Sequence, residues 1–415
     1  MEASIRVRER HPWRLVLLLV AAMIVSFFDR GNLAVAAPVL APQLGLPPWD
    51  LGLLLSAFFW TYAVSQIAAG WLVDRVEVRW VYAGGFLLWS LATLSTAAVG
   101  TFAGLLSMRL LLGLGESVTY PASSRILAAV IPEERRGLAN SLVDLGARLG
   151  PALGTMCGAL LVARFGWRTL FAITGGVALV WLIPWLAWAP RKLSARSAEG
   201  GAQSPVGPNW SQLLRRRSVW GSCGGLCGAN YAWYFLLSWL PSYLVRERHF
   251  TLNSVALWGA MPYLFMAVSS ISCGILADRW ISRGASAVRV RRGFLVTGLI
   301  MTAVLLPSTL LPRIEYAVAG LFMACLAFGV YASNLFSLTQ TLAGPEAAGR
   351  WTGLQNACGN LAGIVSPVVT GWIVTRTGQF QFAFVAAGIA CLLGAASFGF
   401  LIRVPHESRR SAAGG

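Results

Sequence analysis

The most regular feature of the 415-residue chain is a series of long apolar runs separated by short polar intervals. An α-helix needs about 20 predominantly apolar residues to cross a bilayer. Twelve runs meet that length, and each predicts a transmembrane helix. The runs cover residues 14–38, 50–73, 79–99, 102–124, 136–162, 167–189, 218–245, 252–277, 292–311, 316–342, 351–375 and 380–402. The predicted fold class is an all-α integral membrane protein.

One polar interval, residues 190–217, is much longer than the others and divides the runs into six and six. It is rich in Ser, Gly, Pro and Arg, a composition typical of a flexible linker. We therefore predict an N-terminal six-helix bundle over 1–189, a linker over 190–217, and a C-terminal six-helix bundle with a short tail over 218–415.

Composition and charge support a membrane protein and argue against a nucleic-acid partner. The chain is 56% hydrophobic and only 12% charged, whereas about a quarter of a soluble domain is charged. The net charge is +17, but the 33 basic residues lie mostly in short segments between the apolar runs rather than on one continuous face. With the N-terminus inside, 23 of them fall on the cytoplasmic side and six on the other, which predicts that both termini are cytoplasmic. The first run is too long for a signal-peptide core, so we expect a retained helix.

Seven cysteines all lie within apolar runs. Their odd number and irregular spacing predict free thiols rather than a disulfide framework or a metal site. The chain also has no nucleotide-binding loop, and Ser123 and Ser124 have no histidine beside them in the sequence. We expect neither enzymatic activity, nor a metal, nor a cofactor.

The two halves share a motif. "GWLVDRVEVR" (70–79) follows the second run and "GILADRWISR" (274–283) follows the eighth, in the common frame Gly-x-x-x-Asp-Arg-x-x-x-Arg. Each copy alone could be an ordinary helix-terminating turn with solvated charges. The repetition instead indicates an internal duplication of six spans, an architecture typical of transporters that bind substrate near the membrane midplane.

With this repeated motif, the linker and the twelve spans, the chain resembles the major facilitator superfamily over nearly its whole length. The resemblance implies a gating role for the motif. The glycines would allow close helix approach, and the aspartates would face the N-terminus of a neighbouring helix. The implied gating residues are Gly70, Asp74, Arg75, Gly274, Asp278 and Arg279.

Ionisable residues within the spans are confined to the first half of the chain. They are Asp29, Arg30, Arg109, Glu116, Asp144 and Arg148. A single charge at the bilayer centre costs about 2.5–3.5 kcal/mol, so opposite charges are expected to pair. Arg109 and Glu116 are seven residues apart and share a helix face, which we expect to look across to Asp29 and Arg30.

Two interpretations of these charges remain open. They could form a structural ion-pair network, and Asp144 and Arg148 could simply pair along one helix. Alternatively, protonation of Asp29 and Glu116 would leave the arginines without counter-ions, and an anionic substrate could take the vacated place. All three histidines lie in predicted loops or tails, so carboxylates are the candidates for carrying protons.

Four further motifs resemble the anion:cation symporter branch of the superfamily, whose bacterial members import sugar acids and related organic anions with protons. They are "DRGNLAVAAP" (29–38), "RLLLGLGESVTYPASSRI" (109–126), "IPEERRGLANS" (131–141) and "NYAWYFLLSWLPSYL" (230–244). The resemblance implies that Asp29 and Glu116 bind protons and that Arg30 binds the substrate carboxylate. It also implies a role in the substrate cavity for Tyr62, Arg109, Ser333 and Asn356.

Other positions are less determined. Tyr234 and Asn334 could line a hydroxyl-binding wall or bond between helices. Sugar-acid importers of the branch have a glutamine where this chain has Ala147, and the neighbouring Arg148 would suit a different or more acidic anion.

The leading hypothesis is proton-coupled symport of a small organic anion, such as a sugar acid, by alternating access. The partners would be the anion, protons and the lipid bilayer, with the proton gradient as energy source and a monomer in the bacterial inner membrane. An alternative is a proton-coupled exporter, because "GARLGPALG" (146–154) has a glycine pattern associated with antiporters. A non-transporting receptor is a further alternative that would need an added signalling domain.

Overall fold

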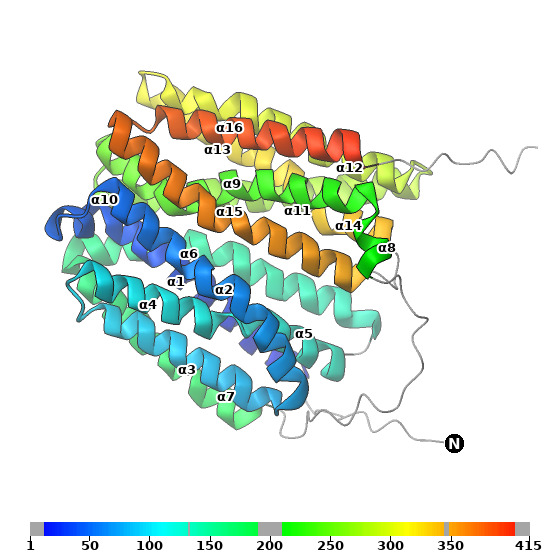
Figure 1. The fold of residues 1–415 in the computed structure, drawn as a ribbon, viewed down its shortest axis with the longest axis horizontal. Helices are drawn as coiled ribbons and strands as arrows, with labels where there is room; N and C mark the ends of the chain where they lie inside the picture. Colours follow the sequence, from blue (N-terminus) through cyan, green and yellow to red (C-terminus); the bar gives the residue numbers. More distant parts are fainter. Residues whose placement is uncertain (1–11, 132, 190–209, 344–347, 403–415) are drawn as a thin grey trace, which may run out of the picture. The chain divides into compact units, whose positions relative to one another are not determined.

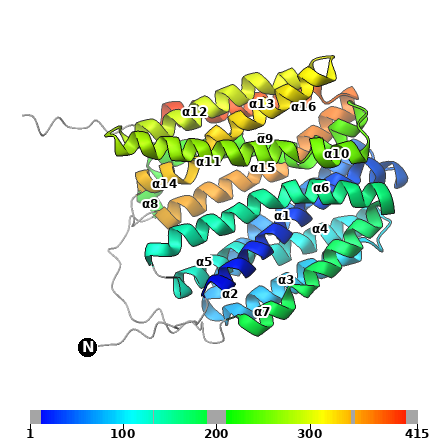
Figure 2. The ribbon, with the colours of Figure 1, turned by 180° about the vertical axis from the view of Figure 1, so that it is seen from behind.

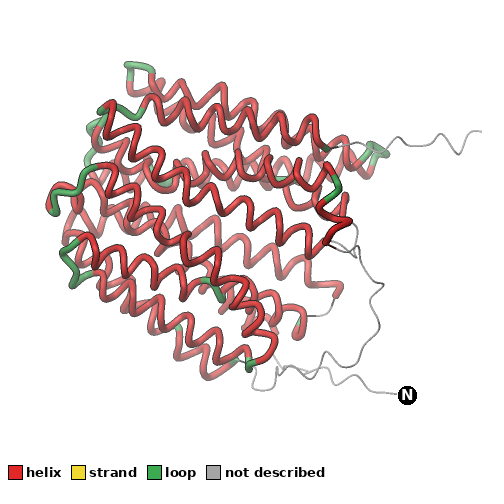
Figure 3. Tube along the Cα trace, in the orientation of Figure 1, coloured by secondary structure: helices red, strands yellow, loops and turns green. Residues whose placement is uncertain are grey.

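The computed structural model describes residues 12–131, 133–189, 210–343 and 348–402 (Figure 1). Every regular element among these residues is a helix (Figure 3). The helices are α1 (Pro12–Gln43), α2 (Pro48–Arg75), α3 (Val78–Thr96), α4 (Phe102–Glu116), α5 (Thr119–Val130), α6 (Glu133–Val180), α7 (Leu182–Trp188), α8 (Trp210–Leu214), α9 (Arg217–Arg246), α10 (Leu252–Trp258), α11 (Met261–Ser282), α12 (Ala287–Leu305), η2 (Leu306–Leu310), α13 (Ile314–Ala332), α14 (Leu335–Ala343), α15 (Ala348–Thr377), α16 (Gln381–Ala396) and η3 (Ser397–Leu401).

Each predicted span corresponds to helical structure. In the described part of the chain, nine helical segments are long and apolar enough to cross a membrane. The remaining predicted spans are α3, α9, and the second of two spans that lie within the single segment Leu145–Trp188. This agreement confirms the predicted all-α membrane fold. Most of the predicted linker lies outside the described residues, and the division into bundles over 1–189 and 218–415 stays a prediction.

Predicted spans are broken at several points, and three of the breaks lie three or four residues before a proline, at Pro121, Pro184 and Pro262, which removes a backbone hydrogen bond. The run 316–342 is also broken, between α13 and α14, without a proline. The run 102–124 forms α4 and α5, which are separated at Ser117–Val118, four residues before Pro121. The run 252–277 forms α10 and α11, which are separated shortly after Trp258, four residues before Pro262. Proline has no N–H to donate to the carbonyl four residues earlier, and its ring clashes with that carbonyl. Hydropathy alone does not register this break.

The boundary predicted between residues 162 and 167 is present within α6. Gly166 has a non-helical backbone, with φ of 81° and ψ of 167°, so α6 consists of two helices that meet in a kink at this residue. This positive φ is strained for residues with a Cβ, so glycine is the residue that the kink requires.

Many large apolar side chains on the predicted spans are exposed. Val64 and Ile67 of α2 are 71% and 81% exposed, and Phe400 is 86% exposed. Apolar surface of this extent would promote association in water. In a bilayer the same side chains contact acyl chains.

The chain forms two compact units, here called unit 1 and unit 2. Among the described residues, unit 1 comprises 12–131, 133–189, 231–264 and 360–386. Within it α1 packs closely on α6: a Cβ added to Gly150 would lie 2.5 Å from Cβ of Phe27 and 2.9 Å from the carbonyl oxygen of Ile24. Helices α3 and α7 lie side by side (Figures 1 and 2). Their aromatic residues are in contact, with 4.8 Å between the ring centroids of Tyr82 and Trp185 and an angle of 37° between the rings.

Unit 2 comprises residues 203–230, 265–359 and 387–415. Helices α12 and α13 run side by side (Figure 2), and a Cβ added to Gly298 would lie 2.4 Å from the backbone nitrogen of Tyr331. Helix α9 is joined to α15 by a hydrogen bond of 2.6 Å from Nε1 of Trp351 to Oγ of Ser222. The seven cysteines are free thiols, as the sequence predicts.

Candidate functional site

The charged residues that the sequence places within spans 1 and 4 meet in the interior of unit 1. Arg30, on α1, and Glu116, the last residue of α4, are 6% and 0% exposed. Nε of Arg30 donates a hydrogen bond of 2.8 Å to Oε2 of Glu116. The contact between spans 1 and 4 that the spacing of Arg109 and Glu116 predicts is therefore present.

A serine on α1 donates a second hydrogen bond to the carboxylate of the ion pair. Ser26 precedes Arg30 by four residues and lies on the same helix face. Its Oγ donates a hydrogen bond of 2.6 Å to the same Oε2 of Glu116, and Nη2 of Arg30 lies 3.4 Å from that Oγ. The other carboxylate oxygen, Oε1, is buried and has no hydrogen-bond partner among the described residues. Glu116 is thus held on one side by two donors and is free on the other.

Aromatic rings surround the guanidinium of Arg30. Its Cζ lies 4.3 Å from the ring centroid of Phe27, 4.8 Å from that of Phe58 and 4.6 Å from that of Tyr62. Cation–π attraction stabilises a desolvated guanidinium by roughly 2 kcal/mol. We call Phe27, Phe58 and Tyr62 the aromatic cage. It stabilises the guanidinium of Arg30 at this position.

Asp29 has different neighbours from Arg30, although the two are adjacent in sequence. It is 2% exposed, and its Oδ1 accepts a hydrogen bond of 2.9 Å from Nδ2 of Asn32. The same nitrogen lies 3.2 Å from Oγ1 of Thr174 on α6. Successive helix residues point about 100° apart, so Arg30 bonds Glu116 while Asp29 bonds Asn32 of its own helix. Oδ2 of Asp29 has no partner among the described residues.

Arg109 is the second buried guanidinium. It is 7% exposed, its Nε donates a hydrogen bond of 3.3 Å to the carbonyl oxygen of Leu54, and its Cζ lies 5.6 Å from the ring of Phe58. When ionised, the carboxylates of Asp29 and Glu116 balance the charges of the two buried guanidiniums, Arg30 and Arg109. Protonation of either carboxylate leaves a net positive charge, which an anion can neutralise.

The other predicted site residues of unit 1 have mixed surroundings. The hydroxyl of Tyr234 donates a hydrogen bond of 3.0 Å to Oδ1 of Asn360, and its ring lies 4.5 Å from that of Phe59. Arg148 is half-buried. The side chain of Asp144 lies outside the described structure, so its predicted pairing with Arg148 stays a prediction.

The glycine pattern at 146–154 has a packing role. A Cβ on Gly146 would lie 2.8 Å from the carbonyl oxygen of Val20, and Gly150 is as close to α1 at Phe27. The pattern therefore brings α6 against α1, a use that does not require antiport.

Predicted substrate residues Ser333, Asn334 and Asn356 belong to unit 2. Nδ2 of Asn334 donates a hydrogen bond of 2.8 Å to Oγ of Ser333, which itself donates one of 2.7 Å to the carbonyl oxygen of Val330. Asn356 is half-buried. The polar groups around the break between α13 and α14 thus bond locally.

The predicted gating motif has few close contacts. A Cβ on Gly70 would meet no described heavy atom within 4 Å, and one on Gly274 would lie 4.0 Å from the carbonyl oxygen of Ser333. The close helix approach expected at Gly70 therefore involves no described atom and stays a prediction. Oδ1 of Asp278 lies 3.9 Å from Nη2 of Arg291 on α12. Arg75 and Arg279 are exposed, and the side chain of Asp74 lies outside the described structure.

The sequence did not reveal Ser26, Asn32 and the phenylalanines of the cage as members of this site. Helical spacing offered a signal for the first two, which lie four residues before Arg30 and three after Asp29. Phenylalanine in a membrane span is too common to be a signal.

Comparison with known proteins gives matches over most of the chain. A sequence model of the Major Facilitator Superfamily matches residues 19–367 and 284–415. The chain is 30% identical to the probable sulfoacetate transporter SauU of Cupriavidus necator, over 94% of this chain and 93% of the relative. It is 28% identical to the probable galactarate/D-glucarate transporter GudP of Escherichia coli, over 96% and 95% of the two chains. A crystal structure of a bacterial homolog of the human lysosomal transporter Spinster has a similar fold, with a TM-score of 0.80 at 17% identity over 95% of this chain and 97% of that chain.

Proposed function

The chain belongs to the Major Facilitator Superfamily, and from that premise we propose that it carries a small organic anion across the inner membrane together with protons. Its membership makes it a membrane transporter and not an enzyme. Relatives named for sulfoacetate and galactarate or D-glucarate transport support anionic cargo. They also agree with the branch of the superfamily that the motifs resemble.

The observation that carries the proposal is the buried ion pair of Arg30 with Glu116. While Glu116 is ionised, it occupies the guanidinium that an incoming anion needs. Protonation of Glu116 removes its charge, and the aromatic cage still holds the guanidinium in place. Proton and anion then favour each other's binding, which is the reciprocity that coupled transport in one direction requires.

The charge of the substrate follows from the number of buried charges at the site. Arg30 and Arg109 together carry two positive charges once Asp29 and Glu116 are protonated. Sulfoacetate and D-glucarate each bear two acidic groups, so either would restore neutrality in the low-dielectric interior. We propose small dianions and hydroxylated carboxylates as the substrate class. Alternating access of the two predicted bundles, with a monomer as the working unit, completes the mechanism.

Proteoliposomes containing the purified full chain provide the test. Radiolabelled sulfoacetate, D-glucarate and the monocarboxylate D-gluconate are offered with an inward proton gradient, and accumulation is compared with that in vesicles without a gradient. We expect gradient-driven accumulation of at least one acid that collapses when a protonophore is added. Extrusion of a cationic dye without anion accumulation would instead favour the exporter.

Matched variants separate coupling from general damage. Glu116→Gln should abolish accumulation above equilibrium, whereas Glu315→Gln, which changes an exposed carboxylate at the start of α13, should transport like wild type. Undiminished accumulation by Glu116→Gln would refute the assignment of this carboxylate.

A further inference from the structure

A groove in unit 2 has the shape and charge of a lipid-binding site, and we propose that it binds one anionic phospholipid of the surrounding bilayer. The groove has a volume of about 480 Å³ and is formed by the end of α11, the start of α12 and the end of α13. In this arrangement Arg289 binds the phosphate, and an acyl chain lies against Trp280 and Phe294. The inference is independent of the transport site in unit 1.

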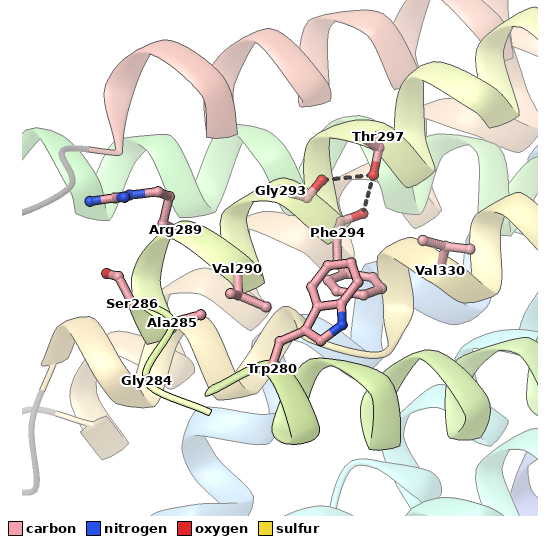
Figure 4. A pocket seen from close by; sticks show the side chains of 10 residues that line it. All are labelled: Trp280, Gly284, Ala285, Ser286, Arg289, Val290, Gly293, Phe294, Thr297 and Val330. Atoms are coloured by element: carbon pink, nitrogen blue, oxygen red, sulfur yellow. Dashed lines mark hydrogen bonds between the residues drawn. The ribbon is translucent and has the colours of Figure 1, made fainter. Parts of the chain in front are cut away.

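The walls of the groove are apolar (Figure 4). Trp280 faces Phe294 with 5.5 Å between ring centroids, and Val290 and Val330 extend the same surface. The hydroxyl of Thr297 donates a hydrogen bond of 2.8 Å to the carbonyl oxygen of Gly293, so it is already satisfied within its helix. Such walls favour contact with hydrocarbon.

A tight turn between α11 and α12 shapes the groove. The backbone N–H groups of Gly284 and Ala285 donate to the carbonyl oxygens of Ile281 and Trp280 at 3.0 and 3.1 Å. These bonds form a Schellman cap that requires the positive φ of Gly284, which is 94°. Gly293 keeps the groove open, because a Cβ there would meet no described heavy atom within 4 Å.

One end of the groove is positively charged. Arg289 is exposed, and Figure 4 shows its side chain extending away from Trp280 and Phe294, beyond the apolar walls. Ser286 lies at the same end, and its side chain makes no helix-capping hydrogen bond. Segment 278–292 contains five arginines and one acid, Asp278, and that acid lies 3.9 Å from Arg291.

This combination favours a lipid over a free anion. A free phosphate would use the arginine but gain nothing from the apolar walls, of which Trp280 is 45% exposed. Helices α11 and α12 both lie in segments apolar enough to cross a membrane, so a chain bound along them continues into the bilayer. Basic pockets beside transmembrane helices bind acidic lipid head groups by this complementarity.

The test measures lipid retention by the purified full chain. Protein in detergent is incubated with equal amounts of phosphatidylglycerol and phosphatidylcholine of identical acyl chains, and bound lipid is counted by native mass spectrometry. We expect wild type to retain several times more phosphatidylglycerol. Arg289→Gln should lower that preference about fivefold, the equivalent of about 1 kcal/mol for one arginine near the head groups, and Arg289→Lys should restore most of it.

Filling the groove tests the apolar part separately. Gly293→Leu should lower retention of both lipids, and Gly293→Ala should do so less, which keeps the series informative if leucine prevents folding. Gly176→Leu on α6, where a Cβ also meets no described atom within 4 Å, should leave retention unchanged. Equal retention of the two lipids by wild type, or unaltered retention in both the Arg289 and Gly293 variants, would overturn the proposal. Competition by inorganic phosphate alone at millimolar concentration would assign the arginine to a free anion and would also overturn it.

Discussion

Replacing Glu116 with glutamine removes one negative charge and little else. The amide has nearly the volume of the carboxylate, and its oxygen can still accept from Ser26 and Arg30, which lie 2.6 and 2.8 Å from Oε2. The guanidinium loses a counter-ion with which it shares a nearly water-free site. At an effective dielectric constant of about 20, unit charges about 4 Å apart attract by about 4 kcal/mol. An anion that binds Arg30 in wild type must overcome this attraction.

Protonation of Glu116 removes its competition with the anion for Arg30, so the sign of the pH dependence of anion affinity can be predicted. Anion binding favours protonated Glu116. Above the pH at which this carboxyl loses its proton in the empty protein, wild-type affinity should fall about tenfold per pH unit, the slope for one linked proton. The fall ends once binding no longer requires protonation, after about a thousandfold in all, because 4 kcal/mol corresponds to about three powers of ten. Glu116→Gln should lose this part of the pH dependence, so its affinity should fall less steeply between pH 5.5 and 8.5 than that of wild type.

The assay is isothermal titration of the detergent-purified proteins with the acid that accumulates in proteoliposomes, at half-unit pH steps and in buffers of different ionisation enthalpy. Wild type should take up a proton on binding, and Glu116→Gln should take up one proton fewer. Glu315→Gln serves as the control, since its carboxylate is exposed. An identical pH slope in wild type and Glu116→Gln would show that the ion pair does not govern access to Arg30, and the reasoning would be refuted.

Three further predictions concern neighbouring positions. Asp29→Asn should retain pH-dependent anion binding, because Asp29 bonds Asn32 rather than Arg30, but should lose proton-driven accumulation; gradient-driven uptake equal to wild type would contradict its role as a proton carrier. Arg30→Ala should weaken anion binding by about 10- to 100-fold, as expected for loss of a charge-assisted hydrogen bond, while the exposed Arg313→Ala should bind like wild type in the same titration. Gly150→Ala should lower the free energy of unfolding by about 1–3 kcal/mol through overpacking against α1, whereas Gly176→Ala should not; equal midpoints in thermal unfolding would contradict the close contact.

The sequence predicts the fold well because the bilayer imposes a length and a composition on every span. It does not predict the breaks before Pro121, Pro184 and Pro262, where the cause is a missing N–H in a segment that stays apolar, nor the break between α13 and α14, which no proline explains. It does predict the boundary at Gly166, where the non-helical backbone lies between two predicted spans. Helical structure is fixed locally by length and hydropathy, while its interruptions depend on individual backbone groups.

The site is predictable to the extent that buried charge demands a partner. The cost of an unpaired charge in lipid made Arg30 and Glu116 candidates for each other, and helical spacing indicated which faces could meet. Nothing in the sequence shows that Asp29 turns toward Asn32 instead. Which of the two adjacent residues meets Glu116 depends on how α1 is rotated against its neighbouring helices. That rotation is determined by the packing of complete helices.

Close packing of α1 on α6 has a consequence for how the cargo would travel. With Gly150 within van der Waals distance of α1, the two helices cannot slide past each other by the width of one methyl group without collision. Arg30 is carried by α1, and Gly146 and Gly150 by the part of α6 before the kink at Gly166, so the guanidinium would move together with this part of α6. In such a motion the distances between Arg30 and the groups of α1 and this part of α6 would stay the same, and a bound solute would meet the same distances at every stage of the cycle.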